Sequence, residues 1–177
     1  MNKGSPYPIF LTVMLLLGCW QMACSSQASQ TSLAFSALFP NQAFDFRNVN
    51  LGMPLDSVRK AESMRPVSED LLGLSYRLDL RNLKEAASLE YYFPENRELD
   101  ALRAIVVNLR FRDTRQAELL YRDCQHLFNK KYGPSVSGSQ GQESWQESHE
   151  NGLLEAHLRL SELESVLSIN ILLIAGK

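Results

Sequence analysis

Side chains in the middle of the chain alternate between apolar and polar residues with a period of two. The alternation covers residues 74–81, 89–93 and 105–112, where Leu, Tyr, Ile, Val or Phe occupies every second position. This period is typical of antiparallel strands that are covered on one face and solvated on the other. Turn-forming sequences follow the first two segments, at 81–84 and 94–96.

Three further strands are predicted at residues 144–148, 154–160 and 166–174, after a flexible stretch at 135–142. Asn151-Gly152 lies between the first two and is a strong hairpin signal, because both residue types tolerate the positive φ angles of two-residue turns. A seventh strand is predicted at Phe44–Leu51, which ends at Gly52.

Apolar residues spaced three and four apart predict two helices. The longer helix covers Thr114–Tyr132, with Asp113 or Thr114 as its cap and Gly133-Pro134 after its end. The shorter helix begins at Pro54 and ends before Pro66.

The predicted element order is β-α-β-β-β-α-β-β-β. It indicates an α+β fold in which two helices pack on one face of an antiparallel sheet. Each helix follows one strand and precedes three, so the chain is either an old duplication of a β-α-β-β-β unit or a coincidental repeat of this layout. Both explanations stay open, because residue identity between the halves is negligible.

The amino terminus predicts export from the cytoplasm. Lys3 supplies a positive charge, and about ten nearly uninterrupted apolar residues follow at Pro8–Leu17. A helix that spans a membrane needs about 20 such residues. Gln21 and the Ser/Gln tract from Ser25 interrupt this run too early. The segment therefore predicts a secretory signal peptide.

Residues 16–19, Leu-Leu-Gly-Cys, resemble the lipobox of bacterial lipoproteins. The resemblance implies a signal peptide at 1–18 and a diacylglyceryl group on Cys19, so that the protein would bind the bilayer through an acylated cysteine. Cys24 is an alternative lipidation site, although Gln21 at its −3 position departs from the pattern. A further alternative is ordinary cleavage after Ala28, which would release a soluble periplasmic protein. With Cys19 lipidated, residues 19–43 would carry the lipid and a flexible tether, and 44–177 would form a single periplasmic domain.

The segment Phe46–Val58 resembles the "apolar, x, Gly-Met, x, x, x, x, Val" opening of two kinds of small envelope domain: the SmpA/OmlA-type outer-membrane assembly lipoproteins and the β-lactamase inhibitor protein-like domains. In those domains the glycine turns the chain into a helix, and the Met/Val pair seats that helix on a sheet. The resemblance implies an α+β domain that binds proteins or scaffolds the envelope without catalysis.

Composition and charge exclude several function classes. The 177 residues include 18 Lys plus Arg and 20 Asp plus Glu, a net charge of −2, which is unlike the basic footprint of a nucleic-acid-binding protein. The three cysteines form no Cys-x-x-Cys pair with zinc spacing. No motif for a catalytic nucleophile, a phosphate loop or a cofactor is present, and His149 and His157 have no companion at metal-ligand spacing. Neither a metal nor a cofactor is therefore expected.

Cys124 and His126 are residue types that can form a nucleophilic Cys/His dyad. Cys124, however, lies on the apolar stripe of the longer helix, where a free cysteine packs as a small hydrophobe. His126 is two positions away and points to another side of that helix. We therefore expect Cys124 in the core.

The candidate binding surface consists of charged and aromatic residues expected on the outer face of the sheet: Arg77, Arg110, Arg112, Arg159, Tyr92 and Trp145. Arginines arranged in this way, with Arg81, could recognise carboxylates or phosphates. The alternative is that they form cross-strand pairs with Glu90 and Glu155. Trp145 could equally cap the core.

The sequence thus favours a membrane-anchored bacterial lipoprotein whose non-catalytic domain binds or scaffolds another cell-envelope component. A periplasmic hydrolase of a cell-wall or lipid substrate is the alternative, and a carrier of an apolar ligand is a third hypothesis. A deep pocket with two titratable groups of displaced pKa would favour the enzyme. A broad sheet face with arginines and aromatics would favour binding, and a cavity between helices and sheet would favour the carrier.

Overall fold

The computed structural model describes residues 32–70, 72–81, 83–94, 101–139, 141–150 and 152–175. The helices in these ranges are α2 (Leu33–Leu38), α3 (Leu55–Ala61) and α4 (Thr114–Tyr132). The strands of the first half are β1 (Ser68–Glu69), β2 (Gly73–Leu78), β3 (Ala87–Tyr92) and β4 (Ala104–Arg110). Those of the second half are β5 (Ser137–Ser139), β6 (Gln142–His149), β7 (Gly152–Ser161) and β8 (Val166–Ala175). The expected signal peptide at 1–18 and residues 19–31 of the expected tether lie outside the described residues.

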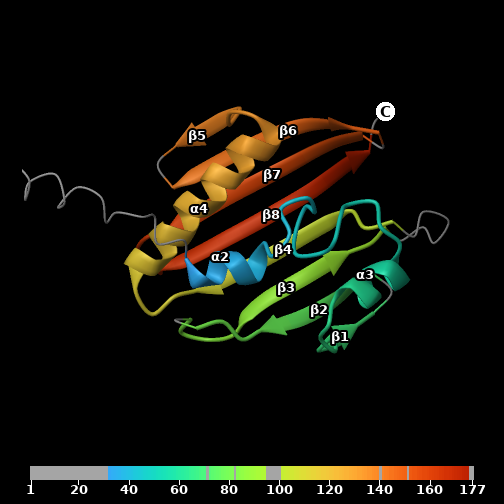
Figure 1. The fold of residues 1–177 in the computed structure, drawn as a ribbon, viewed down its shortest axis with the longest axis horizontal. Coiled ribbons are helices and arrows are strands. Elements are labelled where there is room, and N and C mark those ends of the chain that lie inside the picture. The colour runs from blue at the N-terminus through green and yellow to red at the C-terminus, as the bar shows by residue number, and fades with distance from the viewer. Residues whose placement is uncertain are drawn as a thin grey trace, which may run out of the picture. The chain divides into compact units, whose positions relative to one another are not determined.

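Within the described ranges, eight strands form one antiparallel sheet in the order β1-β2-β3-β4-β8-β7-β6-β5. Each half is a meander of four strands, and the halves meet where β4 pairs with β8 at the centre (Figure 1). The expected antiparallel sheet is confirmed. The fold is more β-rich than the expected layout with two helices, because the short strands β1 and β5 extend the sheet at both edges.

The strand expected at Phe44–Leu51 is wrong. Side chains bend this segment into a loop: the Asp45 carboxylate accepts a hydrogen bond from the Leu51 N–H at 2.9 Å, and the Asn50 side chain accepts one from the Asp45 N–H at 2.9 Å. Arg47 has a φ of 53°, which an extended strand does not allow. Phe46, Val49 and Leu51 are buried as expected, although they belong to a loop, whereas Phe44 is only half-buried. Each half is therefore a helical region followed by four strands, and not a β-α-β-β-β unit.

Helix α2 lies inside the segment that was expected to be a tether. Its residues Ala34, Phe35 and Leu38 are buried, as is Phe39 just after it. The Ser32 N–H donates a hydrogen bond to the Asp123 carboxylate of α4 at 2.8 Å. The folded unit therefore begins by Ser32, before the boundary expected at Phe44.

Helix α4 has the predicted bounds and the predicted cap. The Asp113 side chain accepts a hydrogen bond from the Arg115 N–H at 3.0 Å, and Gly133 with a φ of 84° ends the helix. The side chains of α4 that are buried form the expected stripe: Ala117, Leu120, Cys124, Leu127, Phe128 and Tyr132. This stripe packs on β6, β7 and β8.

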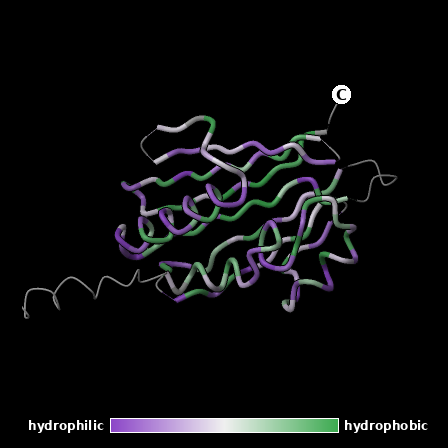
Figure 2. The backbone as a smooth tube through the Cα atoms, turned by 45° about the horizontal axis from the view of Figure 1, so that its top comes forward, coloured by the Kyte–Doolittle hydropathy of each residue, from purple (hydrophilic) through white to green (hydrophobic). Residues whose placement is uncertain are grey.

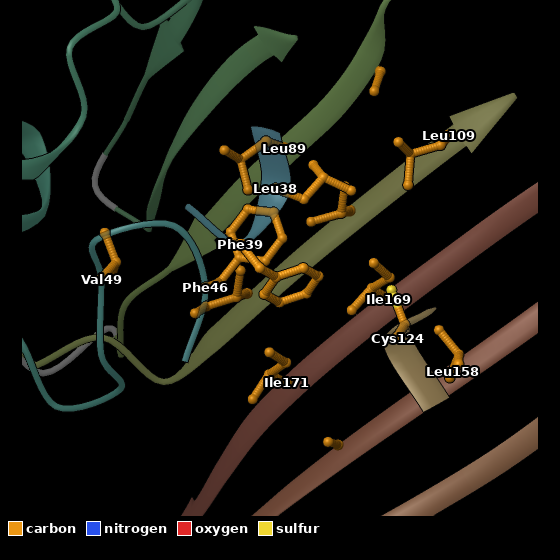
Figure 3. Close-up of a cluster of buried hydrophobic side chains, with 14 of the residues drawn as sticks. Leu38, Phe39, Phe46, Val49, Leu89, Leu109, Cys124, Leu158, Ile169 and Ile171 are labelled. Atoms are coloured by element: carbon orange, nitrogen blue, oxygen red, sulfur yellow. The ribbon is translucent and has the colours of Figure 1, made fainter. Parts of the chain in front are cut away.

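Helices and the 39–54 loop cover the same face of the sheet, and the core fills the layer between them (Figure 1). Figure 3 shows Phe39 and Phe46 beside sheet residues such as Ile171, and Cys124 beside Leu158 and Ile169. The central strand β8 is mostly hydrophobic, whereas the near-edge strand β6 is mostly hydrophilic (Figure 2). No helix in the described part of the chain is long and apolar enough to cross a membrane.

Candidate functional site

The second face of the sheet is not covered by any described element (Figure 1). Side chains along each strand alternate between the core and this open face. In β4, for example, Ile105, Val107 and Leu109 are buried, whereas Asn108 and Arg110 are exposed. The open face is thus the solvated side that the period-two pattern predicted.

Strand register aligns polar side chains of the open face in a row across the sheet. The row consists of Arg77 on β2, Ser88 on β3, Asn108 on β4, Ser168 on β8 and Arg159 on β7. The Ser168 hydroxyl donates a hydrogen bond to the Asn108 side-chain oxygen at 2.8 Å, at the centre of this polar row. An arginine therefore lies toward each end of a row of small polar side chains.

A second row on the same face is mostly apolar. Tyr92, Ala104 and Leu172 are direct neighbours on β3, β4 and β8. The pair Leu153 and Ile174 lies one row farther along the strands. We call these five residues the apolar belt. Tyr92 and Ile174 are 42% and 46% exposed, so the belt offers apolar surface to a partner.

Most of the predicted binding residues come together on the open face. Arg77, Arg110, Arg159 and Tyr92 are exposed there, and Arg112 follows directly beyond the end of β4. The Arg112 Nε donates a hydrogen bond to the Leu83 carbonyl at 3.0 Å, which holds its guanidinium beside the β2–β3 connection.

Trp145 does not belong to this surface. Its side chain is fully buried on the helix-covered face, where its ring packs edge-on against Phe128 at a centroid distance of 5.2 Å. Its indole N–H donates to the Asn129 side-chain oxygen at 2.9 Å. The alternative prediction, that Trp145 caps the core, is the correct one.

The predicted cross-strand pairs with Glu90 and Glu155 are also wrong. Arg77 lies opposite Ser88, and Arg159 lies between Gln142 and Ser168. Arg110 pairs instead with Glu85 at 3.3 Å, in an exposed position. Glu90 accepts a hydrogen bond from the Tyr92 hydroxyl, and Glu155 accepts one from the Gln146 side chain at 2.8 Å. The arginines are thus not neutralised in the way the cross-strand hypothesis required.

A shallow hollow of about 530 Å³ opens beside Arg77, at the end of the open face near the β2–β3 connection. Arg81, Lys84 and Arg112 also line it, together with the carboxylates of Asp79 and Glu85. The sequence pattern does not assign Lys84 to this surface, because a turn residue has no periodicity that places it on one face. A signal was present nonetheless, since Arg81 and Lys84 flank the turn that directly follows the strand of Arg77.

A second shallow hollow of about 500 Å³ lies toward the other edge of the sheet. It is lined by Gln142, His157, Arg159 and Asn170, together with Gly138 and Ser139 of β5. The residues of β5 belong to the stretch 135–142 that the sequence predicts to be flexible, so the sequence does not predict this hollow. The His157 Nε2 lies 3.3 Å from the Glu155 carboxylate, and the His157 side chain is half exposed.

Most titratable groups with shifted pKa values lie in the core, and none of them lines these two hollows. Burial raises the pKa of the Cys124 thiol well above its ordinary value. Burial, with the nearby Glu62 carboxylate second, raises the pKa of the Tyr91 phenol, and burial followed by Asp45 does the same for Tyr132. None of these groups reaches solvent, so each acts in packing. Outside the core, the hydrogen bond to Glu90 raises the pKa of the Tyr92 phenol in the apolar belt. Among the described residues, no cluster of three or more His, Cys, Asp or Glu side chains could hold a metal ion.

The segment Phe46–Val58 bends from a loop into α3. Gly52 has a φ of 86°, which favours glycine, and it precedes Pro54, the residue that caps α3. Val58 of α3 is fully buried and Met53 packs against the core. Comparison of the chain with protein-family models, with curated proteins and with solved structures yields no match.

Proposed function

We propose that this chain is a bacterial lipoprotein, anchored on the periplasmic side of a membrane through Cys19, whose domain binds another protein of the cell envelope. The signal sequence and the lipobox resemblance support the anchor. The open face of the sheet supports the binding role and is the observation that carries it.

The open face has the side-chain chemistry of a protein interface. Interfaces are enriched in arginine and aromatic residues, and their centres are apolar. Here the apolar belt, which includes Tyr92, lies on the same surface as Arg77 and Arg159. A broad surface of this kind suits a protein partner better than a small molecule, which prefers an enclosed pocket.

The position of α2 shortens the tether to the membrane. The folded unit begins by Ser32. With Cys19 lipidated, residues 20–31 would form the whole tether, and twelve flexible residues span about 20 Å on average. The domain would then work close to the membrane surface, on partners in or near the bilayer.

The anchor is tested by mass spectrometry of the mature protein and by incorporation of labelled palmitate. We expect acylated Cys19 at the amino terminus, loss of label in Cys19→Ala, and normal labelling in the matched control Cys24→Ala. The reverse result would move the anchor to Cys24. An unprocessed terminus, or a processed chain without acyl mass, would refute the anchor.

The binding role is tested by affinity capture from detergent-solubilised envelopes with three proteins: the wild type, Leu172→Lys on the open face, and Ser36→Lys on the exposed side of α2. We expect a partner that the wild type and Ser36→Lys retain and that Leu172→Lys loses. Identical capture by all three proteins would refute binding through the open face. The periplasmic hydrolase and the apolar-ligand carrier have no supporting observation in the hollows described above.

We also propose that the two halves arose by duplication of one unit, a helix followed by four strands. The whole domain would belong to the α+β class of small envelope domains. Each half places a four-strand meander after a helix, and the last strands of the two meanders, β4 and β8, pair antiparallel at the centre. This arrangement is what a rotation about an axis through the centre of the sheet would produce. The resemblance of Phe46–Val58 to such domains, and its buried Val58, support the same class.

A further inference from the structure

We infer that the partner presents an acidic, extended segment, which lies across the strands at one end of the open face. The inference rests on the proposed binding role and specifies the chemistry of the partner. It is carried by the distribution of charge on the open face and by the spacing of two arginines along the polar row.

One end of the open face carries a positive excess in a chain whose net charge is negative. We call this the basic end and define it by six cationic side chains: Arg77, Arg81, Lys84, Arg110, Arg112 and Arg159. The carboxylates that line the same three hollows are Asp79, Glu85, Glu143 and Glu164. Cations therefore outnumber these carboxylates, although acids outnumber bases in the whole chain.

The two arginines of the polar row, Arg77 and Arg159, have guanidinium groups available for a partner. Within the described part of the chain, neither Arg77 nor Arg159 forms an ion pair. A guanidinium offers five N–H donors in a planar fork that matches a carboxylate. Both side chains are exposed, so a partner can reach these donors from solvent without first displacing an internal carboxylate.

The spacing of these two arginines favours an extended segment over a single anion. Arg77 on β2 and Arg159 on β7 share the polar row, with β3, β4 and β8 between them. Four strand-to-strand steps correspond to about 19 Å. One phosphate or one carboxylate cannot reach both, whereas about six residues of extended chain cover that distance.

The spacing of the arginines favours separate carboxylates over a single phosphate. Four cations and two carboxylates, Asp79 and Glu85, line the hollow beside Arg77, so its positive excess attracts an anion of either kind, but one phosphate placed there does not reach Arg159. Singly charged carboxylates spaced along a chain can each approach one arginine. Small polar side chains, Ser88, Asn108 and Ser168, lie between the arginines and leave room for a backbone to cross.

The same partner would also contact the apolar belt. The row of the belt nearest to the polar row contains Tyr92. Tyr92 lies four residues beyond Ser88 along β3, so the two rows are about 13 Å apart. A protein surface can place apolar side chains on the belt while its acidic segment lies on the basic end. A partner of this kind is a protein with an acidic segment bordered by apolar residues.

Site-specific photocrosslinking in cells that produce the full chain tests the inference. Asn108 at the centre of the polar row is replaced by p-benzoylphenylalanine, and the crosslinked peptide of the partner is identified by mass spectrometry. We expect a crosslink to a protein segment with an excess of Asp and Glu. In the charge-reversed variant Arg77→Glu/Arg159→Glu the crosslink yield should fall at least tenfold, because like charges then face each other.

A matched variant separates this effect from a general change of net charge. Arg115→Glu/Arg122→Glu on the exposed side of α4 makes the same charge change on the opposite face of the domain. Its crosslink yield should equal that of the wild type. Circular dichroism of all variants verifies that each is folded.

Each other outcome overturns the inference in a distinguishable way. A crosslink to a protein segment without excess acid, or one insensitive to Arg77→Glu/Arg159→Glu, removes the acidic segment but leaves the proposed binding role standing. A crosslink to lipid, or to a second copy of this chain, replaces the partner class. Absence of any crosslink from Asn108, together with identical affinity capture by the wild type and Leu172→Lys, refutes both the inference and the proposed function.

Discussion

Removal of the Glu62 carboxylate should be one of the most destabilising single changes in this chain. Glu62 follows α3, and its side chain is only 1% exposed. It accepts hydrogen bonds from the Arg47 Nε, at 3.0 Å to each carboxylate oxygen, and from the Tyr91 hydroxyl of β3. Arg47 also donates to the Ala37 carbonyl of α2 at 3.0 Å. One carboxylate thus connects two helical regions, the 39–54 loop and the sheet.

The structure sets the size of the effect. In Glu62→Ala the Arg47 guanidinium, only 16% exposed, loses its counter-charge, and the Tyr91 hydroxyl loses its acceptor. Breaking a buried ion pair by removing one partner costs about 3–5 kcal/mol. A domain of this kind is stable by only about 5–15 kcal/mol. The variant should therefore lose a large part of its free energy of unfolding.

The matched control is Glu85→Ala, which removes a carboxylate from an exposed pair. Glu85 and Arg110 are 60% and 43% exposed and 3.3 Å apart. Pairs of this kind contribute about 0–1 kcal/mol. The two variants remove the same chemical group, so the difference between them measures burial and not charge.

Urea unfolding of the mature protein, followed by circular dichroism, measures both variants. We expect a much lower midpoint for Glu62→Ala, a nearly unchanged midpoint for Glu85→Ala, and equal slopes. A double-mutant cycle with Tyr91→Phe should show coupling, because the two side chains share a hydrogen bond. If Glu62→Ala lost no more stability than Glu85→Ala, the account of Glu62 as a buried connector would be refuted.

Three further predictions concern the core. Trp145→Ala should lower the free energy of unfolding by about 3–5 kcal/mol, since it empties a fully buried site beside α4; a loss below 1 kcal/mol in urea titration would contradict the burial. The Cys124 thiol should resist iodoacetamide in the folded protein and react after unfolding, because burial raises its pKa and blocks access. Equal labelling rates of Cys124 in the folded and the urea-unfolded protein would show that it is accessible. Tyr91 and Tyr132 have raised pKa values when folded, so stability is fully present below pH 10 and falls above it, as tyrosinate forms first in the unfolded chain. The absorbance of tyrosinate near 295 nm, compared between folded and urea-unfolded protein, should show delayed ionisation of these two phenols, and coincident curves would contradict it.

The elements with the strongest local periodicity were predictable. The bounds of α4 follow from its apolar stripe, the Asp113 cap and Gly133, all of which act within a few residues of chain. Strands β2, β3, β4, β7 and β8 follow from alternation alone, whereas β6 depends on the Asn151-Gly152 hairpin signal that joins it to β7. β1 and β5 are two and three residues long, too short for a period to be detected, and they exist because a neighbouring strand pairs with them.

The candidate surface was predictable only in part, for a reason that lies in strand register. Alternation correctly groups Arg77 with Arg110 and Arg159 on the polar side of their strands. It cannot place Trp145, whose strand is otherwise polar on both sides, so that its burial depends on α4 packing against it. Alternation also does not show which residues lie opposite Glu90 and Glu155 on the neighbouring strands, because that depends on strand register. In the structure these opposite residues are not arginines.

By itself the sequence determined which segments become the long helix and the main strands, and which side of most strands is apolar. It also predicts a lipid anchor, which stays a prediction. These properties depend on the order of neighbouring side chains along a few turns or strand residues. Tertiary structure alone decided that Phe44–Leu51 forms a loop, that α2 joins the core, and that two distant arginines share one row. Such outcomes depend on free energies of contacts between residues far apart in the chain, as between Arg47 and Glu62 or between Ser32 and Asp123, and these contacts exist only once the sheet has formed.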